Sequence, residues 1–180
     1  MTVLDLIVKS GIAEAINSLP DHIRKNRNAA AETIENNVRK KIIKSHLSDP
    51  AFYEKMSALL DEIIKQRKAE AIAYEEYLRK IAHLAKQVQE GMADSTPEEL
   101  DTPGKRALFN NLMLDVADSG KGESHEPGAV FGAAEAQAAL ARAMAIDAAV
   151  KAARPDGWRG NTPRENVIKK AMHDILGNEA

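Results

Sequence analysis

The chain has 180 residues, of which 44% are apolar, and its formal net charge is −2. It contains no cysteine, which excludes disulfides, thiolate nucleophiles and thiolate metal sites. It also contains no run of about 20 apolar residues that could cross a bilayer, and no apolar N-terminal segment with a cleavage site. We therefore expect a soluble, cytoplasmic protein with no membrane partner.

Composition and charge also bear on fold class and on nucleic-acid binding. Alanine is abundant whereas only three Phe, three Tyr and one Trp are present, which favours an all-α fold of closely packed helices. Residues 1–48 carry eight basic and five acidic side chains, and residues 92–131 carry three and eight. The nearly balanced total predicts no strong general attraction to nucleic acid, so any such role depends on local clusters.

The first two predicted helices are short and mostly apolar. One covers residues 3–10, after a possible N-cap at Thr2, and the other covers residues 12–19, before Pro20. Helices of this length with so little polar surface are marginal alone. We expect them to dock on a longer helix, or on a segment that preceded them in a longer chain.

The third predicted helix covers residues 29–46 and carries a basic cluster. Asn28 is its expected N-cap, and its apolar stripe consists of Ala31, Ile34, Val38 and Ile42. Cations near its C-terminus suit the helix dipole and a solvated face, while the alternative is contact with DNA phosphates. The residues that such a DNA contact would use are Arg24, Lys25, Arg27, Arg39, Lys40, Lys41 and Lys44.

One very long helix, residues 49–91, is predicted to organise the fold as a spine on which the shorter helices pack. Asp49 is a good N-cap, Pro50 suits the first turn and Gly91 suits the end, with no glycine or proline between Pro50 and Gly91. At about 1.5 Å per residue such a helix runs roughly 60 Å unless it bends near the charged patch at residues 65–70. The expected apolar stripe contains Phe52, Met56, Leu59, Ile63, Tyr74, Leu78, Ile81, Ala85 and Val88.

The remaining segment, residues 92–180, contains three Thr-Pro sequences that resemble helix starts. Thr96 and Thr162 each have a glutamate three residues later, as in a capping box, and Thr102-Pro103 opens a helix to about Asp118. A further alanine-rich helix is expected at residues 133–154, and the Gly-rich stretch 119–132 is expected to be a flexible loop. The apolar faces predicted for the two outer helices are Leu108, Leu112 and Val116, and then Val167, Ile168, Ala171, Ile175 and Leu176.

Motifs for catalysis are absent from the sequence. The histidines show no metal-ligand spacing, Gly120-Lys121-Gly122 lacks the other residues of a phosphate loop, and no nuclease or nucleophile-elbow pattern occurs. We therefore predict no catalytic residue, cofactor or metal. Tyr74, Tyr77, Trp158, Arg159 and Asn161 are candidate structural anchors or interface residues, and Trp158 beside Arg159 could instead stack on a base or a partner.

Four stretches in one order resemble the C-terminal helical region of the endonuclease (motor, or R) subunit of type I restriction enzymes. They contain the sequences ENNVRKKI at 35–42, YEKMS at 53–57, YEEYL at 74–78 and DGWRGN at 156–161. The departure from the family lies in the Gly-rich stretch 119–132 and part of the alanine-rich helix, which are longer than the usual link. The predicted organisation is N-terminal helices at 1–48, the spine at 49–91 and C-terminal helices at 92–180, together one domain of a longer parent chain.

The resemblance implies a parent that cleaves DNA after ATP-driven translocation, with ATP and Mg as its cofactors, and that assembles with methyltransferase and specificity subunits. None of those catalytic motifs lies in these residues, so the chain itself is not expected to be an enzyme. Three functions remain open. The first is an assembly domain that holds the R subunit on the methyltransferase–specificity core, through the far end of the spine and the apolar surface of the helices at 3–19. The second is a domain that contacts double-stranded DNA between motor and nuclease, and the third is an unrelated helical scaffold.

Overall fold

Every regular element in the described part of the chain is a helix, as the composition predicts. The computed structural model describes residues 2–119 and 133–177, without the side chains of 116–119. The chain divides into two compact units, unit 1 (Met1–Pro97) and unit 2 (Glu98–Ala180). The residues predicted as segments 1–48 and 49–91 thus belong to one unit, and most of the stretch expected to be a flexible loop, residues 120–132, lies outside the described residues. Over the described ranges, no helix is long and apolar enough to cross a membrane.

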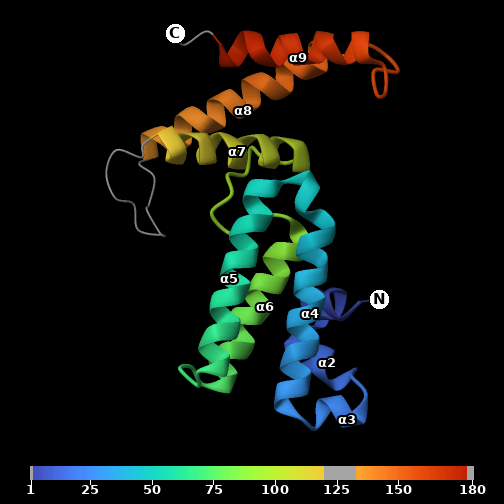
Figure 1. The fold of residues 1–180 in the computed structure, drawn as a ribbon, viewed down its shortest axis with the longest axis vertical. Helices are drawn as coiled ribbons and strands as arrows, with labels where there is room; N and C mark the ends of the chain where they lie inside the picture. Colours follow the sequence, from blue (N-terminus) through green and yellow to red (C-terminus); the bar gives the residue numbers. More distant parts are fainter. Residues whose placement is uncertain (1, 120–132, 178–180) are drawn as a thin grey trace. The chain divides into compact units, whose positions relative to one another are not determined.

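Unit 1 consists of three long helices that lie side by side and several short ones (Figure 1). The long helices are α4 (Arg27–Ser45), α5 (Pro50–Lys68) and α6 (Tyr74–Glu90), with the 3₁₀ turn η1 (His46–Ser48) between α4 and α5. The short helices are α1 (Val3–Ser10), α2 (Ile12–Asn17) and α3 (Asp21–Arg24). The last of these lies in a stretch where the sequence analysis predicted no helix.

The prediction of a single helix over residues 49–91 is wrong. The chain leaves the helical path after Lys68 and starts α6 at Tyr74, so that α5 and α6 form a helical hairpin. Glu70 takes a left-handed conformation with φ 52°, and the amides of Glu70 and Ala71 donate to the carbonyl oxygens of Arg67 and Gln66. This hydrogen-bond pattern is a Schellman motif, which usually has glycine at the left-handed position. Because a glutamate occupies it here, the sequence carries no visible stop.

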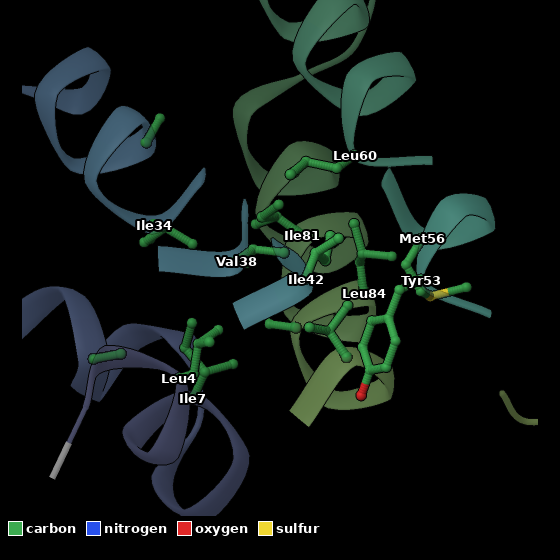
Figure 2. Packing of buried hydrophobic residues seen from close by; sticks show 14 of the residues in the cluster. Leu4, Ile7, Ile34, Val38, Ile42, Tyr53, Met56, Leu60, Ile81 and Leu84 are labelled. Carbon is green, nitrogen blue, oxygen red and sulfur yellow. The ribbon is translucent and has the colours of Figure 1, made fainter. Parts of the chain in front are cut away.

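The hairpin is favoured because it turns both apolar stripes of the predicted spine toward one core. From α5 this core takes Phe52, Tyr53, Met56 and Leu60, and from α6 it takes Tyr77, Ile81, Leu84, Ala85 and Val88. Leu59, predicted on the buried stripe, is 41% exposed and Leu60 is buried in its place. The predicted stripe of α4 is confirmed, since Ala31, Ile34, Val38 and Ile42 are all buried. Figure 2 shows labelled members of this core, among them Val38, Ile42, Met56, Leu60, Ile81 and Leu84.

The first two helices cover this core rather than presenting apolar surface. Leu4 and Ile7 of α1 are buried, α1 contacts both α6 and α4, and Ala15 of α2 is fully buried. A capping box joins Thr2 and Asp5 at the start of α1. The prediction that these helices dock on the long segment is confirmed for α1, which packs on α6, whereas α2 packs on α1. The apolar surface that they were expected to offer to a partner is therefore largely used inside unit 1.

The helix ends agree with the sequence at some positions and differ at others. Asp49 caps α5 by accepting from the amide of Phe52 at 3.2 Å, and Gly91 closes α6 in the left-handed conformation, both as predicted. The cap of α4 is Asn26 rather than Asn28. The predicted helix start at Thr96 is wrong, because residues 94–101 contain only short turns and no helix, and the Thr96 hydroxyl accepts from the amide of Ala93 instead.

Unit 2 contains α7 (Pro103–Ser119), α8 (Ala133–Ala153) and α9 (Thr162–Leu176), and α8 contacts both of the others. The predicted starts near Pro103 and Ala133 are confirmed, and Asn161 rather than Thr162 caps α9. The predicted apolar faces are only partly buried: Ile168 is buried, Leu108 and Leu112 are half-buried, and Val167 and Leu176 are 46% and 48% exposed. The predicted core position Val116 has a side chain outside the described part.

Candidate functional site

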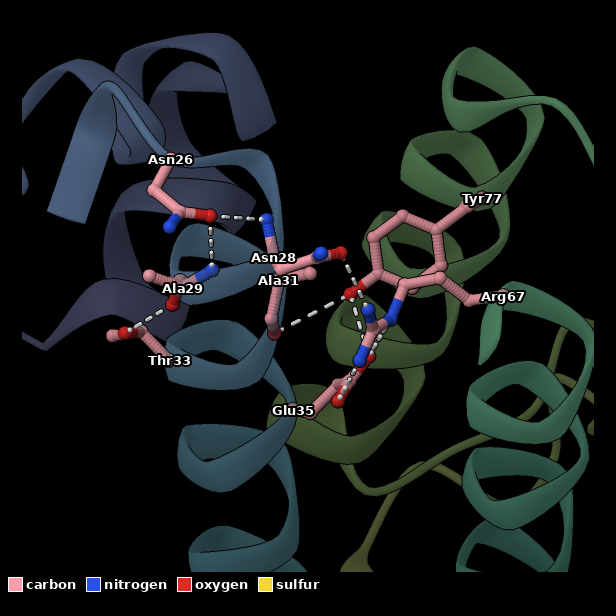
Figure 3. Close-up of polar contacts among 8 residues, drawn as sticks. All are labelled: Asn26, Asn28, Ala29, Ala31, Thr33, Glu35, Arg67 and Tyr77. Carbon is pink, nitrogen blue, oxygen red and sulfur yellow. Dashed lines mark hydrogen bonds and ion pairs between the residues drawn. The ribbon is translucent and has the colours of Figure 1, made fainter. Parts of the chain in front are cut away.

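The most elaborate polar arrangement in unit 1 is a buried cluster around Glu35, which lies on the inward face of α4 and is 5% exposed. Arg67, from the last turn of α5, donates from Nε to Glu35 Oε1 at 2.7 Å and from Nη2 to Oε2 at 3.2 Å. The Tyr77 hydroxyl, from α6, lies 3.0 Å from Glu35 Oε1 and 3.3 Å from the carbonyl oxygen of Ala31. Arg67 Nη1 also donates to Asn28 Oδ1 at 3.2 Å (Figure 3). We call Glu35, Arg67, Tyr77 and Asn28 the Glu35 cluster.

The electrostatics of the Glu35 cluster keep a carboxylate, a guanidinium and a neutral phenol together. Burial raises the pKa of Tyr77 well above its ordinary range, and the negative charge and hydrogen bond of Glu35 raise it further, so the hydroxyl remains a donor. Burial lowers the pKa of Arg67, but its hydrogen bond to Glu35 and the charge of Glu35 outweigh that effect and leave the pKa raised. The cluster is thus a charge-assisted cross-link between α4, α5 and α6.

This arrangement is unsuited to proton transfer with a substrate. Both carboxylate oxygens of Glu35 already accept hydrogen bonds, and Glu35 and Tyr77 are buried in unit 1. Over the part of the chain that the structure describes, no group of three or more His, Asp or Glu residues is placed to hold a metal ion. The cluster therefore acts as a structural lock that fixes where the α5–α6 hairpin joins α4.

The candidate anchors Tyr74 and Tyr77 are brought together next to this lock. Their rings stack with centroids 5.9 Å apart, and the guanidinium of Arg27 lies 5.0 Å from the centroid of the Tyr74 ring. Tyr77 is fully buried, whereas Tyr74 is half-buried and burial raises its pKa. Tyr77 is an internal anchor of unit 1, and the half-buried Tyr74 stacks on it at the edge of the core.

The seven candidate DNA contacts do not form a single patch. Arg24 and Lys25 both pair with Asp21 before α4, and Arg27 stacks on Tyr74. The remaining four candidates follow after Val38 in α4, and at about 1.5 Å per residue Lys40 is about 20 Å further along the helix than Arg27. The seven cations are therefore two groups at opposite ends of one helix.

The group near the C-terminal end of α4 includes a feature that the sequence analysis missed. Arg39 pairs with Asp61 at 2.6 Å, whereas within the described residues Lys40 and Lys44 are exposed and make no ion pair. Ile43 is 69% exposed and Leu47, in η1, is 91% exposed. The signal was present in the sequence, because Ile43 and Leu47 lie off the Ala31–Ile42 stripe. We call Lys40, Ile43, Lys44 and Leu47 the α4 end face.

In unit 2 the remaining candidates lie in the turn between α8 and α9. Trp158 is half-buried, and the guanidinium of Arg159 lies 4.5 Å from the centroid of its ring. Asn161 Oδ1 accepts from the amide of Arg164 at 3.2 Å and so starts α9. One side of the indole ring is thus occupied by a cation of the same turn, which leaves less of the ring for stacking on a base.

Comparisons of the chain with protein-family models, with curated proteins and with solved structures find no match.

Proposed function

We propose that the chain is the C-terminal helical domain of a type I restriction endonuclease R subunit, and that it holds the ATP-dependent translocase on the methyltransferase–specificity core. The observation that carries the proposal is the ordered set of sequences ENNVRKKI, YEKMS, YEEYL and DGWRGN. The first three fall on α4, α5 and α6 of one packed unit.

Residues from the first three sequences pack together in the core of unit 1, so we treat these sequences as parts of one structural unit. Glu35 from the first sequence and Tyr77 from the third form the Glu35 cluster with Arg67. Tyr53 and Met56 from the second are buried in the same core.

The folding back of the predicted spine, and the burial of much of the apolar surface of α1 and α2, change how the proposed assembly would work. A contact through a far end of residues 49–91 is no longer available as a mechanism, because that segment folds back as α5 and α6. The proposal therefore depends on an exposed face of the helical units. It also includes the expectation that the chain on its own neither cuts DNA nor hydrolyses ATP.

Sedimentation velocity of the purified 180-residue chain mixed with the methyltransferase–specificity core from the same genome tests the proposal. We expect the chain to co-sediment with the core in the absence of DNA and ATP. An unrelated acidic helical protein of similar size serves as the control for nonspecific association. Independent sedimentation of chain and core at micromolar concentration would refute the assembly function.

A second candidate function, contact with double-stranded DNA, is favoured by Lys40 and Lys44, which make no ion pair within the described residues. Titration of a nonspecific duplex at low and moderate salt tests it, because each neutralised phosphate contributes a slope of about −0.9 to the plot of log K against log salt. Binding that weakens steeply with salt would favour this function, and no binding at low salt would remove it.

A further inference from the structure

The α4 end face combines apolar side chains with cations at the surface of unit 1. Lys40, Ile43 and Lys44 lie on the side of α4 opposite Val38 and Ile42, and Leu47 follows in η1 directly after the helix. Single exposed apolar residues are common on protein surfaces. Here two large apolar residues four positions apart, Ile43 at 69% and Leu47 at 91% exposure, accompany two exposed lysines.

The positive charge of this face is not balanced by its neighbours in the described residues. The nearby carboxylate Asp61 is engaged by Arg39 at 2.6 Å, and Glu54 lies 3.4 Å from His46. Lys40 and Lys44 make no ion pair there. A partner that brings carboxylates to this face would therefore gain attractive charge interactions as well as bury Ile43 and Leu47.

Charge and apolarity together distinguish the possible occupants. A DNA backbone would satisfy the lysines but would leave Ile43 and Leu47 against phosphates and sugars, where apolar side chains gain little. A protein surface with an apolar hollow bordered by Asp or Glu complements both parts of the face. Interfaces of this kind concentrate their binding energy in a few central apolar side chains surrounded by polar ones.

We propose that the α4 end face is the surface through which this chain docks on the methyltransferase–specificity core, and that it is received there by an apolar hollow flanked by carboxylates. This inference rests on the proposed assembly function and specifies the surface that performs it. It assigns the contact to residues Lys40, Ile43, Lys44 and Leu47 rather than to the internal anchors Tyr74 and Tyr77.

The test measures the Kd of the full 180-residue chain for the purified core, without DNA, by fluorescence anisotropy at two salt concentrations. The two test variants are Ile43→Ser with Leu47→Ser, and Lys40→Glu with Lys44→Glu. The matched controls are Val167→Ser with Leu176→Ser, which are 46% and 48% exposed, and Arg79→Glu with Lys86→Glu on the exposed side of α6. All the substituted side chains are exposed, so melting temperatures should stay close to wild type.

We expect each test variant to raise Kd at least about tenfold and each control to stay within about twofold. If the wild-type chain binds the core and both test variants bind it with the same Kd, this inference is overturned while the assembly function stands. No binding by the wild type would overturn the assembly function and this inference with it. A parallel titration with a nonspecific duplex covers the DNA reading. If the lysine variant keeps the wild-type Kd for the core but loses binding to the duplex, the face is a DNA contact and the docking proposal is wrong.

Discussion

Unit 1 and unit 2 are both helical but are held together differently. In unit 1 the fully buried side chains include Ile34, Met56, Leu60, Tyr77 and Ile81, which come from the three successive helices α4, α5 and α6. The buried apolar residues of the described part of unit 2 are Leu100, Ala139, Ala143, Ile146 and Ile168, of which two are alanines. Larger side chains of unit 2, such as Phe109 and Trp158, are only half-buried.

Both units consist of amphipathic helices, yet they bury very different amounts of large apolar side chain. The helices of unit 1 converge on one core and add a buried ionic lock, so each truncation there leaves a space or an unpaired charge. In unit 2, α8 packs on α7 and on α9 through small residues, and less apolar area depends on any one side chain. We expect unit 1 to lose more stability per substitution.

The largest expected effect comes from removing the cation of the Glu35 cluster. Arg67→Ala leaves the Glu35 carboxylate buried without its partner and should lower the free energy of unfolding by about 3–5 kcal/mol, as for other broken buried pairs. Urea denaturation followed by circular dichroism measures this. Arg39→Ala is the control, because its pair with Asp61 is exposed and should contribute less than about 1 kcal/mol. Equal losses in the two variants would show that the cluster is no stronger than a surface pair.

Matched leucine truncations compare the two units directly. Leu60→Ala in unit 1, where Leu60 is fully buried, should cost about 2–5 kcal/mol. Leu112→Ala in unit 2, where the leucine is half-buried, should cost about 1 kcal/mol, because less area returns to water. Urea unfolding of both variants provides the measurement. A larger loss for Leu112→Ala would contradict the comparison between the units.

Trp158→Ala tests whether the turn before α9 contributes more to stability than the rest of unit 2. The ring is half-buried and carries the Arg159 guanidinium, so we expect a loss of about 1–3 kcal/mol, below the value for a core tryptophan. Thermal unfolding gives the result, and Trp158→Phe should recover part of the loss. An unchanged melting temperature would remove the anchor role and favour stacking on a partner.

Tyr77→Phe removes the hydroxyl group that Tyr77 contributes to the Glu35 cluster and keeps the ring that fills the core. At neutral pH the variant should lose about 1 kcal/mol through the missing hydrogen bond to Glu35. The folded protein raises the pKa of Tyr77, whereas the unfolded chain loses this proton near pH 10. Stability contributed by the hydroxyl therefore falls as pH rises above about 10, and the difference between wild type and variant should shrink there. Urea titrations of both proteins at neutral and alkaline pH measure it, and a constant difference would contradict the assignment.

The sequence-based predictions were accurate for features that depend on neighbouring residues and failed for features that depend on contacts distant in sequence. The Ala31–Ile42 stripe, the Asp49-Pro50 start and the Gly91 end depend on neighbouring residues, and all three are confirmed. The pairing of Glu35 with Arg67 spans 32 positions and exists only because the hairpin brings the end of α5 against α4. One hint was readable, since Glu35 follows Ala31 by four residues on a buried face and so required a partner.

The predictions that failed most clearly were those about which apolar surfaces stay exposed, because exposure depends on contacts between distant segments. Helices α1 and α2 were expected to offer apolar area to a partner, but their amphipathic pattern does not specify which face of unit 1 receives them. Ile43 and Leu47 look like ordinary helix residues until the fold shows that nothing within the described chain covers them. Their position off the Ala31–Ile42 stripe suggests exposure, but only the arrangement of helices shows that the pair is uncovered.

The smallest expected effect concerns Glu70, the residue that ends α5 and hid the hairpin from the sequence. A left-handed non-glycine residue costs about 1–2 kcal/mol in the folded state, while a new glycine adds about 0.5–1 kcal/mol of unfolded-chain entropy. Glu70→Gly should therefore raise the free energy of unfolding by about 0.5–1 kcal/mol, measured by urea denaturation. Gly91→Ala is the opposite control, because φ is +67° there and the added Cβ would lie 3.3 Å from the Tyr53 hydroxyl. If Glu70→Gly destabilises the chain, residues 69–73 do not form the left-handed helix end described, and α5 and α6 could join into the single helix that the sequence suggests.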